Sequence, residues 1–487
     1  MQLVIHMQTY TMRSTTLIAL AASFLSVDGL VLRKSESSAP KVVGLDLHRA
    51  TIPYTRNKRD MLRKRGSVLA ALDNLETLYF VNGSLGTPAQ PMRLHLDTGS
   101  SDLWVNTASS SLCQGQGSPC SVSGTYSAND SSTYNYVGSW FNISYVDGSG
   151  ASGDYVTDKF TIGGSTLTDF QFGVGYTSSS AQGILGVGYK VNEVQVGRAG
   201  MEPYDNLPAK MVAEGLIQSS AFSLWLNDLD ASKGSILFGG VDTDHFEGEL
   251  KTVPIQKESN AFAEFLITLT KVTLGSKTLE DNMALAVLLD SGSSLTYLPD
   301  DMVTTIFSMV GAVYQQEEGV AFIPCSTATS GANMTFTFSE ATITVPIDEL
   351  VLDLVAITGK RTAFSNGVEA CLFGIAPAGD GTNVLGDTFL RSAYVVYDID
   401  NNEVSLAQTK YNATSSNVLE IGKGSGSVPS AVAVASPVTA TDGLVRGGGG
   451  IGGGGGSENA ASSVAPLAAS LLAGSVAFAA GFSLYFV

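Results

Sequence analysis

Two short runs in this chain repeat one pattern. Residues 94–101 read LHLDTGSS and residues 287–294 read VLLDSGSS, so each sets an aspartate after an apolar run. An ionised carboxylate beside apolar strands is costly unless hydrogen bonds satisfy it. Four neighbouring hydroxyl side chains can supply such bonds: Thr98, Ser100, Ser291 and Ser293. A glycine in each run allows a tight turn with close backbone approach: Gly99 and Gly292. One such run is ordinary turn chemistry, but two runs 193 residues apart predict an internally duplicated site.

Length and composition limit the architecture. A chain of 487 residues is too long for one compact core, so two lobes with tails are expected. Glycine is abundant (53 residues), and runs rich in Thr, Ser, Val and Tyr alternate with glycine-containing turns, which indicates a mostly β protein. The net charge of −18 argues against nucleic acid as a partner.

The charge is unevenly distributed. Residues 31–65 hold ten Lys or Arg and three Asp or Glu, whereas residues 66–487 hold 16 and 41. A basic leader ahead of an acidic body predicts a segment that docks on the body and is later removed. The alternative is a solvated basic tail.

Further motifs extend the pattern over residues 76–410, and together they resemble the pepsin-like aspartic proteases. The aspartate runs match the two active-site loops of that family, and other stretches match in the same order: GTPAQ at 86–90, ISYVDGS at 143–149, GILG at 183–186 and NVLGD at 383–387. Within that family, the chain resembles the fungal GPI-anchored proteases of the yapsin and candidapepsin type.

The resemblance implies an all-β, bilobal fold, with two β-barrel-like lobes and the active-site cleft between them. It also implies that Asp97 and Asp290 share one proton and activate a water molecule that attacks a peptide carbonyl. The other residues expected at the substrate are those of the flap hairpin and the two loops: Tyr145, Asp147, Ser149, Gly99, Gly292 and Ser293. No cofactor and no metal is required. The apolar-apolar-Gly strands of the GILG and NVLGD motifs are expected to lie behind the two aspartates.

Some individual positions depart from the family pattern or are ambiguous. Val146 stands where the family usually has glycine. Asp147 favours acceptance of Lys or Arg before the scissile bond, since an acidic residue there is associated with this preference in fungal relatives; the alternative is that it only closes the hairpin turn. Trp104 is expected behind the flap, or simply in the core. His95 is interpreted as structural, because the only other histidine after the propeptide is His245 and neither has a metal-ligand partner.

The chain divides into six segments. We expect a signal peptide over residues 1–29, with the start at Met1 or Met12 left open, and a basic propeptide over 30–65 that is cut after Arg65. The N-terminal lobe should span 66–248 and the C-terminal lobe 249–410. Strands are expected at 78–85, 92–97, 140–145, 155–162 and 184–187, and a helix near 206–214.

Four cysteines allow three pairings. Proximity favours Cys113 with Cys120 and Cys325 with Cys371, and the one bridge per lobe of the resembled family agrees. Free thiols in a cytosolic protein are the alternative. Five Asn-x-Ser/Thr sequons predict glycosylation: Asn82, Asn129, Asn142, Asn333 and Asn412. Asn82 and Asn142 fall in expected strands, which argues against their use.

After residue 410 the composition changes. Residues 411–458 are rich in Ser, Val, Ala and Gly, and we expect a flexible linker without a core. Residues 459–487 combine small residues, a short polar spacer and an apolar tail, which predicts a GPI-attachment signal, with Asn459 as the attachment residue and Ser457 as the second choice. A single membrane-spanning helix is the alternative.

These observations predict a secreted, surface-anchored, monomeric aspartic endopeptidase that hydrolyses proteins or peptides at acid pH. It would be attached to the plasma membrane or cell wall through a GPI lipid. A catalytically inactive relative that binds peptides or glycoproteins is the main alternative, and a structural glycoprotein of the cell wall is another.

Overall fold

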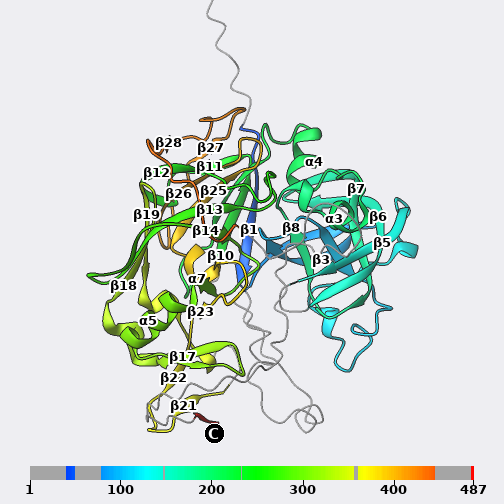
Figure 1. Ribbon diagram of the computed structural model, residues 1–487. Coiled ribbons are helices and arrows are strands. Elements are labelled where there is room, and N and C mark those ends of the chain that lie inside the picture. The colour runs from blue at the N-terminus through cyan, green and yellow to red at the C-terminus, as the bar shows by residue number, and fades with distance from the viewer. Residues whose placement is uncertain are drawn as a thin grey trace, which may run out of the picture. The chain divides into compact units, whose positions relative to one another are not determined.

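The computed structural model describes residues 40–49, 78–145, 149–231, 233–355 and 360–444, and the backbone of 484–486. Strands dominate these residues (Figure 1). An N-terminal strand precedes the first lobe: β1 (Val43–Arg49). The first-lobe strands are β2 (Tyr79–Leu85), β3 (Gln90–Asp97), β4 (Leu103–Asn106), β5 (Asn135–Ser144), β6 (Gly150–Ile162), β7 (Ser165–Ser178), β8 (Gly183–Gly186), β9 (Ala221–Trp225), β10 (Lys233–Phe238) and β11 (Gly240–Asp242).

The second half of the chain also consists mainly of strands. Its strands are β12 (Phe246–Pro254), β13 (Leu266–Leu274), β14 (Lys277–Leu289), β15 (Thr296–Leu298), β16 (Val313–Gln315), β17 (Val320–Pro324), β18 (Asn333–Phe338), β19 (Ala341–Pro346), β20 (Val351–Leu352), β21 (Thr362–Phe364), β22 (Ala370–Phe373), β23 (Ile375–Pro377), β24 (Val384–Leu385), β25 (Ala393–Asp398) and β26 (Glu403–Thr409). Three strands follow: β27 (Val418–Glu420), β28 (Ala431–Ala433) and β29 (Leu484–Phe486).

Helices are short. The α-helices are α3 (Val194–Ala199), α4 (Leu207–Ala213), α5 (Asp300–Val310) and α7 (Asp387–Leu390), and the 3₁₀ turns are η1 (Pro119–Ser121), η2 (Ala128–Asp130), η3 (Lys190–Asn192), η4 (Cys325–Ser330) and η5 (Ile347–Leu350). None of the helices in the described ranges is both long and apolar enough to cross a membrane.

Local sequence explains individual elements. In β18 the side chains of Met334, Phe336 and Phe338 are buried while the residues between them are partly exposed, which is the period of two expected for a strand. Helix α5 has two aspartates in its first turn, where the helix dipole favours negative charge. It ends at Gly311, whose φ of 72° is left-handed and suits glycine.

The two halves use the same strand arrangement around each aspartate run. Strand β3 pairs in parallel with β8, and β8 pairs antiparallel with β4. Strand β14 likewise pairs in parallel with β24, which pairs antiparallel with β15. The apolar-apolar-Gly strands therefore lie beside the two aspartate-bearing strands, as expected from the sequence.

A sheet of 14 strands, counted over the described residues, joins the two halves. Its order is β28-β12-β26-β25-β9-β10-β1-β2-β3-β8-β4-β7-β6-β5. Strand β1 comes from the expected propeptide and lies between β10 and β2, pairing Val43 with Phe238 and Arg49 with Tyr79. The expected lobe boundary at residues 248–249 falls inside β12, because this strand continues through it.

The expected flexible linker is wrong for residues 411–444, which we call the C-terminal strap. Strand β27 pairs antiparallel with β11, and β28 pairs in parallel with β12. The strap then reaches β14, where Thr441 N donates to Ala284 O (2.9 Å) and Ala286 N donates to Asp442 O (2.9 Å). Four strap side chains are buried: Ile421, Val428, Val434 and Ala440. The polar, small-residue composition of this segment predicted that it has no core of its own. The unpaired edges of strands can nevertheless form hydrogen bonds with its backbone, and its few spaced apolar side chains complete the packing.

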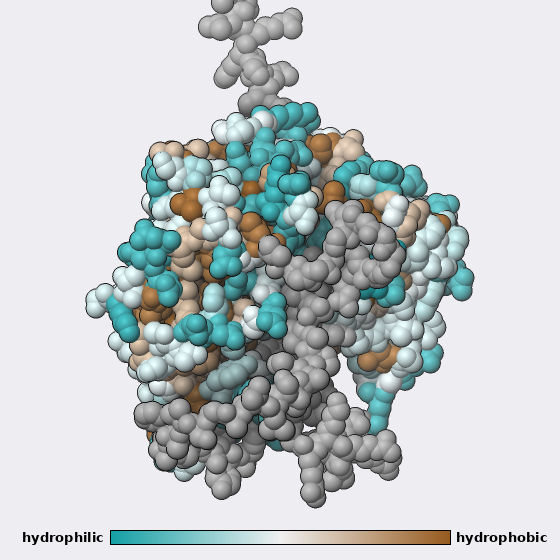
Figure 2. All heavy atoms as spheres, viewed as in Figure 1, coloured by the Kyte–Doolittle hydropathy of each residue, from teal (hydrophilic) through white to brown (hydrophobic). Residues whose placement is uncertain are grey.

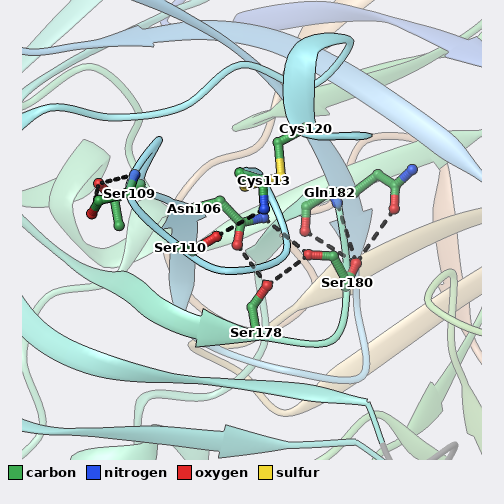
Figure 3. Close-up of a disulfide and its surroundings, with 9 residues drawn as sticks. Asn106, Ser109, Ser110, Cys113, Cys120, Ser178, Ser180 and Gln182 are labelled. Atoms are coloured by element: carbon green, nitrogen blue, oxygen red, sulfur yellow. Dashed lines mark hydrogen bonds between the residues drawn. A yellow bond between two sulfur atoms is a disulfide. The ribbon is translucent and has the colours of Figure 1, made fainter. Parts of the chain in front are cut away.

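Both expected disulfides are present, Cys113–Cys120 and Cys325–Cys371, with Cα–Cα distances of 5.1 and 5.0 Å. Figure 3 shows the first bridge beside Asn106 at the end of β4. The Asn106 side chain accepts a hydrogen bond from Ser178 Oγ (2.6 Å) and donates to Ser180 O (3.0 Å), which ties the end of β4 to the end of β7.

Buried apolar side chains from both halves form one large cluster that extends from β1 to the strap. On the face shown in Figure 2, hydrophilic and neutral residues prevail and hydrophobic ones occur in small separate groups. Such scattered apolar residues are normal for a protein surface.

Candidate active site

The two aspartate runs meet. Asp97 ends β3, and Asp290 directly follows β14. Thr98 N donates to Ser291 Oγ (3.2 Å), and Ser291 N donates to Thr98 Oγ1 (2.9 Å). Each hydroxyl also donates into the opposite strand, Thr98 Oγ1 to Leu289 O (2.9 Å) and Ser291 Oγ to Leu96 O (3.0 Å). These four bonds hold the two loops together with approximate two-fold symmetry.

Each carboxylate has the same set of local donors. Gly99 N donates to Asp97 Oδ1 and Gly292 N to Asp290 Oδ1, both at 2.8 Å. Ser100 Oγ donates to Asp97 Oδ2, and Ser293 Oγ donates to Asp290 Oδ2 (2.7 Å). Ser100 and Ser293 thus satisfy the carboxylates as predicted. Thr98 and Ser291 do not: their hydroxyls join the two loops instead.

The glycines matter because of the opposite carboxylate. A Cβ atom on Gly99 would lie 2.6 Å from Asp290 Oδ1, well inside contact distance. A Cβ atom on Gly292 would likewise collide with Asp97 Oδ1. Each carboxylate therefore lies directly against the turn of the other loop. Only glycine, which has no Cβ atom, leaves enough space for it.

The environment favours proton retention by the pair. Burial raises the pKa of both Asp97 and Asp290 above the ordinary aspartate value, and the negative charge of Asp97 raises the pKa of Asp290 further. The contact between the two carboxyl groups lowers the pKa of Asp97 and raises that of Asp290. Two adjacent carboxyls of this kind titrate as one unit that shares a proton.

A hairpin formed by β5 and β6 lies next to this pair. Tyr145 N donates to Ser149 O (2.8 Å), which closes the hairpin below its tip. Trp104 Nε1 donates to Tyr145 OH (2.8 Å), so the buried Trp104 supports the tyrosine as expected. Burial and then the charge of Asp97 raise the pKa of Tyr145 well above its usual value, so it stays a neutral phenol. Val146 and Asp147 lie outside the described residues.

The model of the family described as eukaryotic aspartyl protease matches residues 78–409, which include both aspartate loops and the hairpin. The chain belongs to this family. It is an aspartic-type endopeptidase, as the names of its fungal relatives also indicate.

Several relatives of the protease share most of its length. The probable aspartic-type endopeptidase opsB of Aspergillus oryzae is 54% identical over 437 residues, which cover 88% of each chain. Secreted aspartic protease 8 of Candida albicans is 33% identical over 428 residues, covering 83% of this chain and 98% of the relative. The crystal structure of aspartic proteinase from Irpex lacteus matches with a TM-score of 0.57 and 24% identity over 70% of this chain and 96% of its own. The pepsin-like, all-β fold is thereby confirmed.

The protease also contains a buried acidic cluster that the sequence did not reveal. The Asp102 carboxylate accepts hydrogen bonds from Tyr155 OH (2.5 Å), Tyr204 OH (2.8 Å) and Val194 N (2.9 Å). Beside it, burial and then the charge of Asp102 raise the pKa of Glu193 to about 9. Asp102 was visible as the residue after the DTGSS run, but its tyrosine partners come from distant segments.

A second buried group lies behind the other loop. Asp387 N donates to Ser293 O (2.8 Å), which fixes α7 against the loop of Asp290. Burial raises the pKa of the Asp387 carboxyl well above its usual range, although the charge of Arg391 opposes this. Arg391 itself is fully buried and donates from Nε to Glu349 Oε2 (2.5 Å).

The remaining predicted positions are the two histidines, the five sequon asparagines and the two residues proposed for lipid attachment. His95 is buried against Phe80, with ring centroids 5.8 Å apart, and His245 stacks on Trp225 at 4.0 Å, so both are packing residues. All five sequon asparagines are exposed, including the three that lie in strands: Asn82, Asn142 and Asn333. Ser457 and Asn459, proposed for lipid attachment, lie outside the described residues.

Proposed function

We propose that Asp97 and Asp290 are the catalytic pair and that the protease cleaves peptide bonds in proteins or peptides with a water molecule held between their carboxyl groups. The observation that carries this is the symmetric junction of the two loops, which sets each carboxylate against the opposite turn. Two buried carboxyls with raised pKa values supply one base and one acid.

The chemistry balances without a covalent intermediate. The ionised carboxylate takes a proton from the water as the water oxygen bonds to the carbonyl carbon, and the protonated carboxyl donates its proton to the carbonyl oxygen. In the second half, one carboxyl protonates the amide nitrogen while the C–N bond breaks and the other takes back the hydroxyl proton. The products are a carboxylic acid and an amine, and the pair again holds one proton.

The hairpin around Tyr145 and Ser149 closes over the substrate and excludes water from the pair in this proposal. Its support is the hydrogen bond from Trp104, which holds the Tyr145 phenol on the catalytic side of the hairpin. The carboxylates are held in position by the turns at Gly99 and Gly292 and by the hydroxyl of Ser293. No cofactor and no metal takes part.

The same proposal includes the cellular route. The protein is secreted with the aid of a signal peptide, loses its basic propeptide, and stays at the cell surface through a GPI lipid on Asn459. Two disulfides and five exposed sequons support passage through an oxidising, glycosylating compartment, and the Candida albicans relative is named as secreted. Strand β1 supports the propeptide assignment, because it already docks on the body between β2 and β10.

The test is peptide hydrolysis by the secreted, processed protein between pH 3 and pH 8. Asp97→Asn and Asp290→Asn should each lower kcat by about 10²–10⁴-fold or more, since each removes a group that transfers a proton. Asp169→Asn, at an exposed position in β7 where the change creates no new sequon, is the matched control and should leave kcat unchanged. A folded wild-type protein that cleaves nothing at any pH would instead favour the inactive, peptide-binding alternative.

A further inference from the structure

A cavity of about 440 Å³ lies on the outer side of the flap hairpin, between β5, β6 and α3. Its lining includes Trp140 and Asn142 of β5, Ser152 of β6, and Arg198 of α3. The neighbouring residues of β5, Phe141 and Ile143, are buried with Trp104 in the core behind the flap. Phe141 also contributes to the cavity lining, and Trp140 packs against the same core cluster, so the cavity borders the packing behind the flap; its lining includes neither aspartate of the proposed catalytic pair.

Two side chains of the cavity lining carry hydrogen-bond donors that lack acceptors in the part of the chain that the structure describes. Trp140 Nε1 and Arg198 Nε are both sealed from solvent, and neither has a hydrogen-bond partner among the described residues. Arg198 is held in position by its donation from Nη2 to Ser144 Oγ (3.1 Å). Two buried N–H groups without acceptors are costly, so a rotation of either side chain that turns its N–H toward oxygen atoms in the cavity would be stabilising.

An occupant is already attached to the rim. Asn142 is exposed, lines the cavity, and belongs to the sequon Asn142-Ile143-Ser144. Trp140, two residues earlier on the same strand, also lines the cavity. A sugar on Asn142 Nδ2 would begin at this rim, beside a wall that Trp140 and Arg198 help to form.

The chemistry of the first N-acetylglucosamine units matches the lining. Their hydroxyl and acetamide oxygens accept hydrogen bonds of the kind that Trp140 Nε1 and Arg198 Nε can donate. Their C–H faces can pack on an indole ring. The cavity volume lies in the range of about 300–1,000 Å³ that is usual for sites binding small molecules.

We propose that this cavity binds the innermost sugars of an N-linked glycan carried by Asn142, so that the glycan fastens α3 to the base of the flap hairpin. The inference rests on the secretory route of the proposed function, since only that route attaches such a glycan. The strand position of Asn142, which argued against its use at the sequence level, then serves to aim the sugar along Trp140.

The test begins with the full chain secreted from a eukaryotic host and mass spectrometry of the peptide containing Asn142. Thermal unfolding is then measured for three forms: fully glycosylated, trimmed by endoglycosidase H to one N-acetylglucosamine per site, and the Asn142→Gln variant. The trimmed form should keep most of the stability, while Asn142→Gln should lower Tm by about 1–2 °C, because the Tm shift that a given loss of stability produces becomes smaller as the chain becomes longer. Asn129→Gln removes an exposed sequon on η2 outside the cavity and should leave Tm unchanged.

A double-mutant cycle separates sugar binding from ordinary packing. Trp140→Ala and, separately, Arg198→Gln should each lower Tm more in the glycosylated protein than in the Asn142→Gln background. Equal losses in both backgrounds would overturn the inference, as would an unmodified Asn142 in a protein glycosylated elsewhere. Absence of glycan at every sequon would also overturn it, and that result alone would count against the secretory route in the proposed function.

Discussion

Thr98 and Ser291 exchange hydrogen bonds across the two halves of the protease, each backbone N–H donating to the other residue's hydroxyl at 3.2 and 2.9 Å. Because each hydroxyl donates onward to a strand carbonyl of the opposite half, four bonds depend on two side chains. Both residues are buried, so water cannot replace a bond that is lost.

This geometry predicts unequal effects for two substitutions of Thr98. Thr98→Val keeps the shape but removes the hydroxyl, and it should lower the free energy of unfolding by about 1–3 kcal/mol because buried partners are left unsatisfied. It should also lower kcat, since the two carboxylates lose their fixed separation. Thr98→Ser retains the oxygen and should behave much like wild type. Denaturant unfolding and peptide hydrolysis measure both effects, and equal behaviour of the Val and Ser variants would contradict the prediction.

Gly99 provides a second prediction. A methyl group at this position would lie 2.6 Å from Asp290 Oδ1, so Gly99→Ala must push the opposite carboxylate or its loop away. Because a misplacement of about 1 Å can cost about 10²-fold in rate, kcat should fall by at least that factor. Gly422→Ala, in the C-terminal strap, is the control, because its Cβ would meet only Ser427 at an ordinary 3.5 Å. Near-normal turnover of Gly99→Ala would show that the two loops are not in such close contact.

The third prediction concerns pH and stability. Burial raises the pKa of Glu193 to about 9 from its ordinary value of 4.5, so the folded protein keeps a proton there that the unfolded chain has lost. Stability should therefore fall as pH rises between these values, by at most about 1.4 kcal/mol per pH unit from this group. The raised pKa values of the catalytic pair act in the same direction, and loss of their shared proton should stop hydrolysis at high pH.

Glu193→Gln mimics the protonated side chain and should flatten this dependence. Urea midpoints at pH 5, 6.5 and 8 should fall less steeply for the variant than for wild type, whereas Glu202→Gln at an exposed position should follow wild type. Parallel curves for Glu193→Gln and wild type would show that Glu193 is already ionised in the folded protein.

The fourth prediction separates the C-terminal strap from the anchor. A chain that ends at residue 444 lacks the proposed lipid signal but keeps every strap contact, so it should be released into the medium with full activity. A chain that ends at residue 410 loses the buried Ile421, Val428 and Val434 and the pairing with β11, β12 and β14. Since burial of one such side chain contributes roughly 1.5–3 kcal/mol, this shorter chain should be poorly stable.

Secretion yield, Tm and specific activity of the two truncated chains measure this difference. If both chains were equally stable and active, the strap would be dispensable. If the chain ending at 444 remained attached to membranes, the anchor would have to lie elsewhere.

The fifth prediction concerns specificity. Asp147 lies in sequence between Tyr145 and Ser149, whose backbone hydrogen bond closes the flap hairpin. We expect its carboxylate to bind a Lys or Arg side chain before the scissile bond through a charge-assisted hydrogen bond. Asp147→Thr should lose cleavage after Lys and Arg and keep cleavage after Leu and Phe, measured as kcat/KM on four matched peptides. Equal loss on all four would assign Asp147 to the hairpin turn alone.

Much of the site could be predicted from sequence because its signals are local. The flap hairpin and the strand ending at Gly186 were expected from the resemblance to the family, whereas the aspartate loops depend on short apolar runs and turn residues. Helix α4 (Leu207–Ala213) was expected for the same reason, within two residues of its bounds. The disulfide pairing followed from proximity together with the family pattern.

Contacts between distant segments could not be predicted in this way. The hydroxyls of Thr98 and Ser291 looked like carboxylate donors, and only the meeting of the two halves gives them different partners. The acidic cluster of Asp102 and Glu193 depends on tyrosines far along the chain. The C-terminal strap looked like a linker because its apolar residues are few and widely spaced. The position of the strap is decided by unpaired strand edges elsewhere in the fold. Hydrogen bonds between two backbones require no particular side chains, so the strap's own sequence does not reveal this pairing.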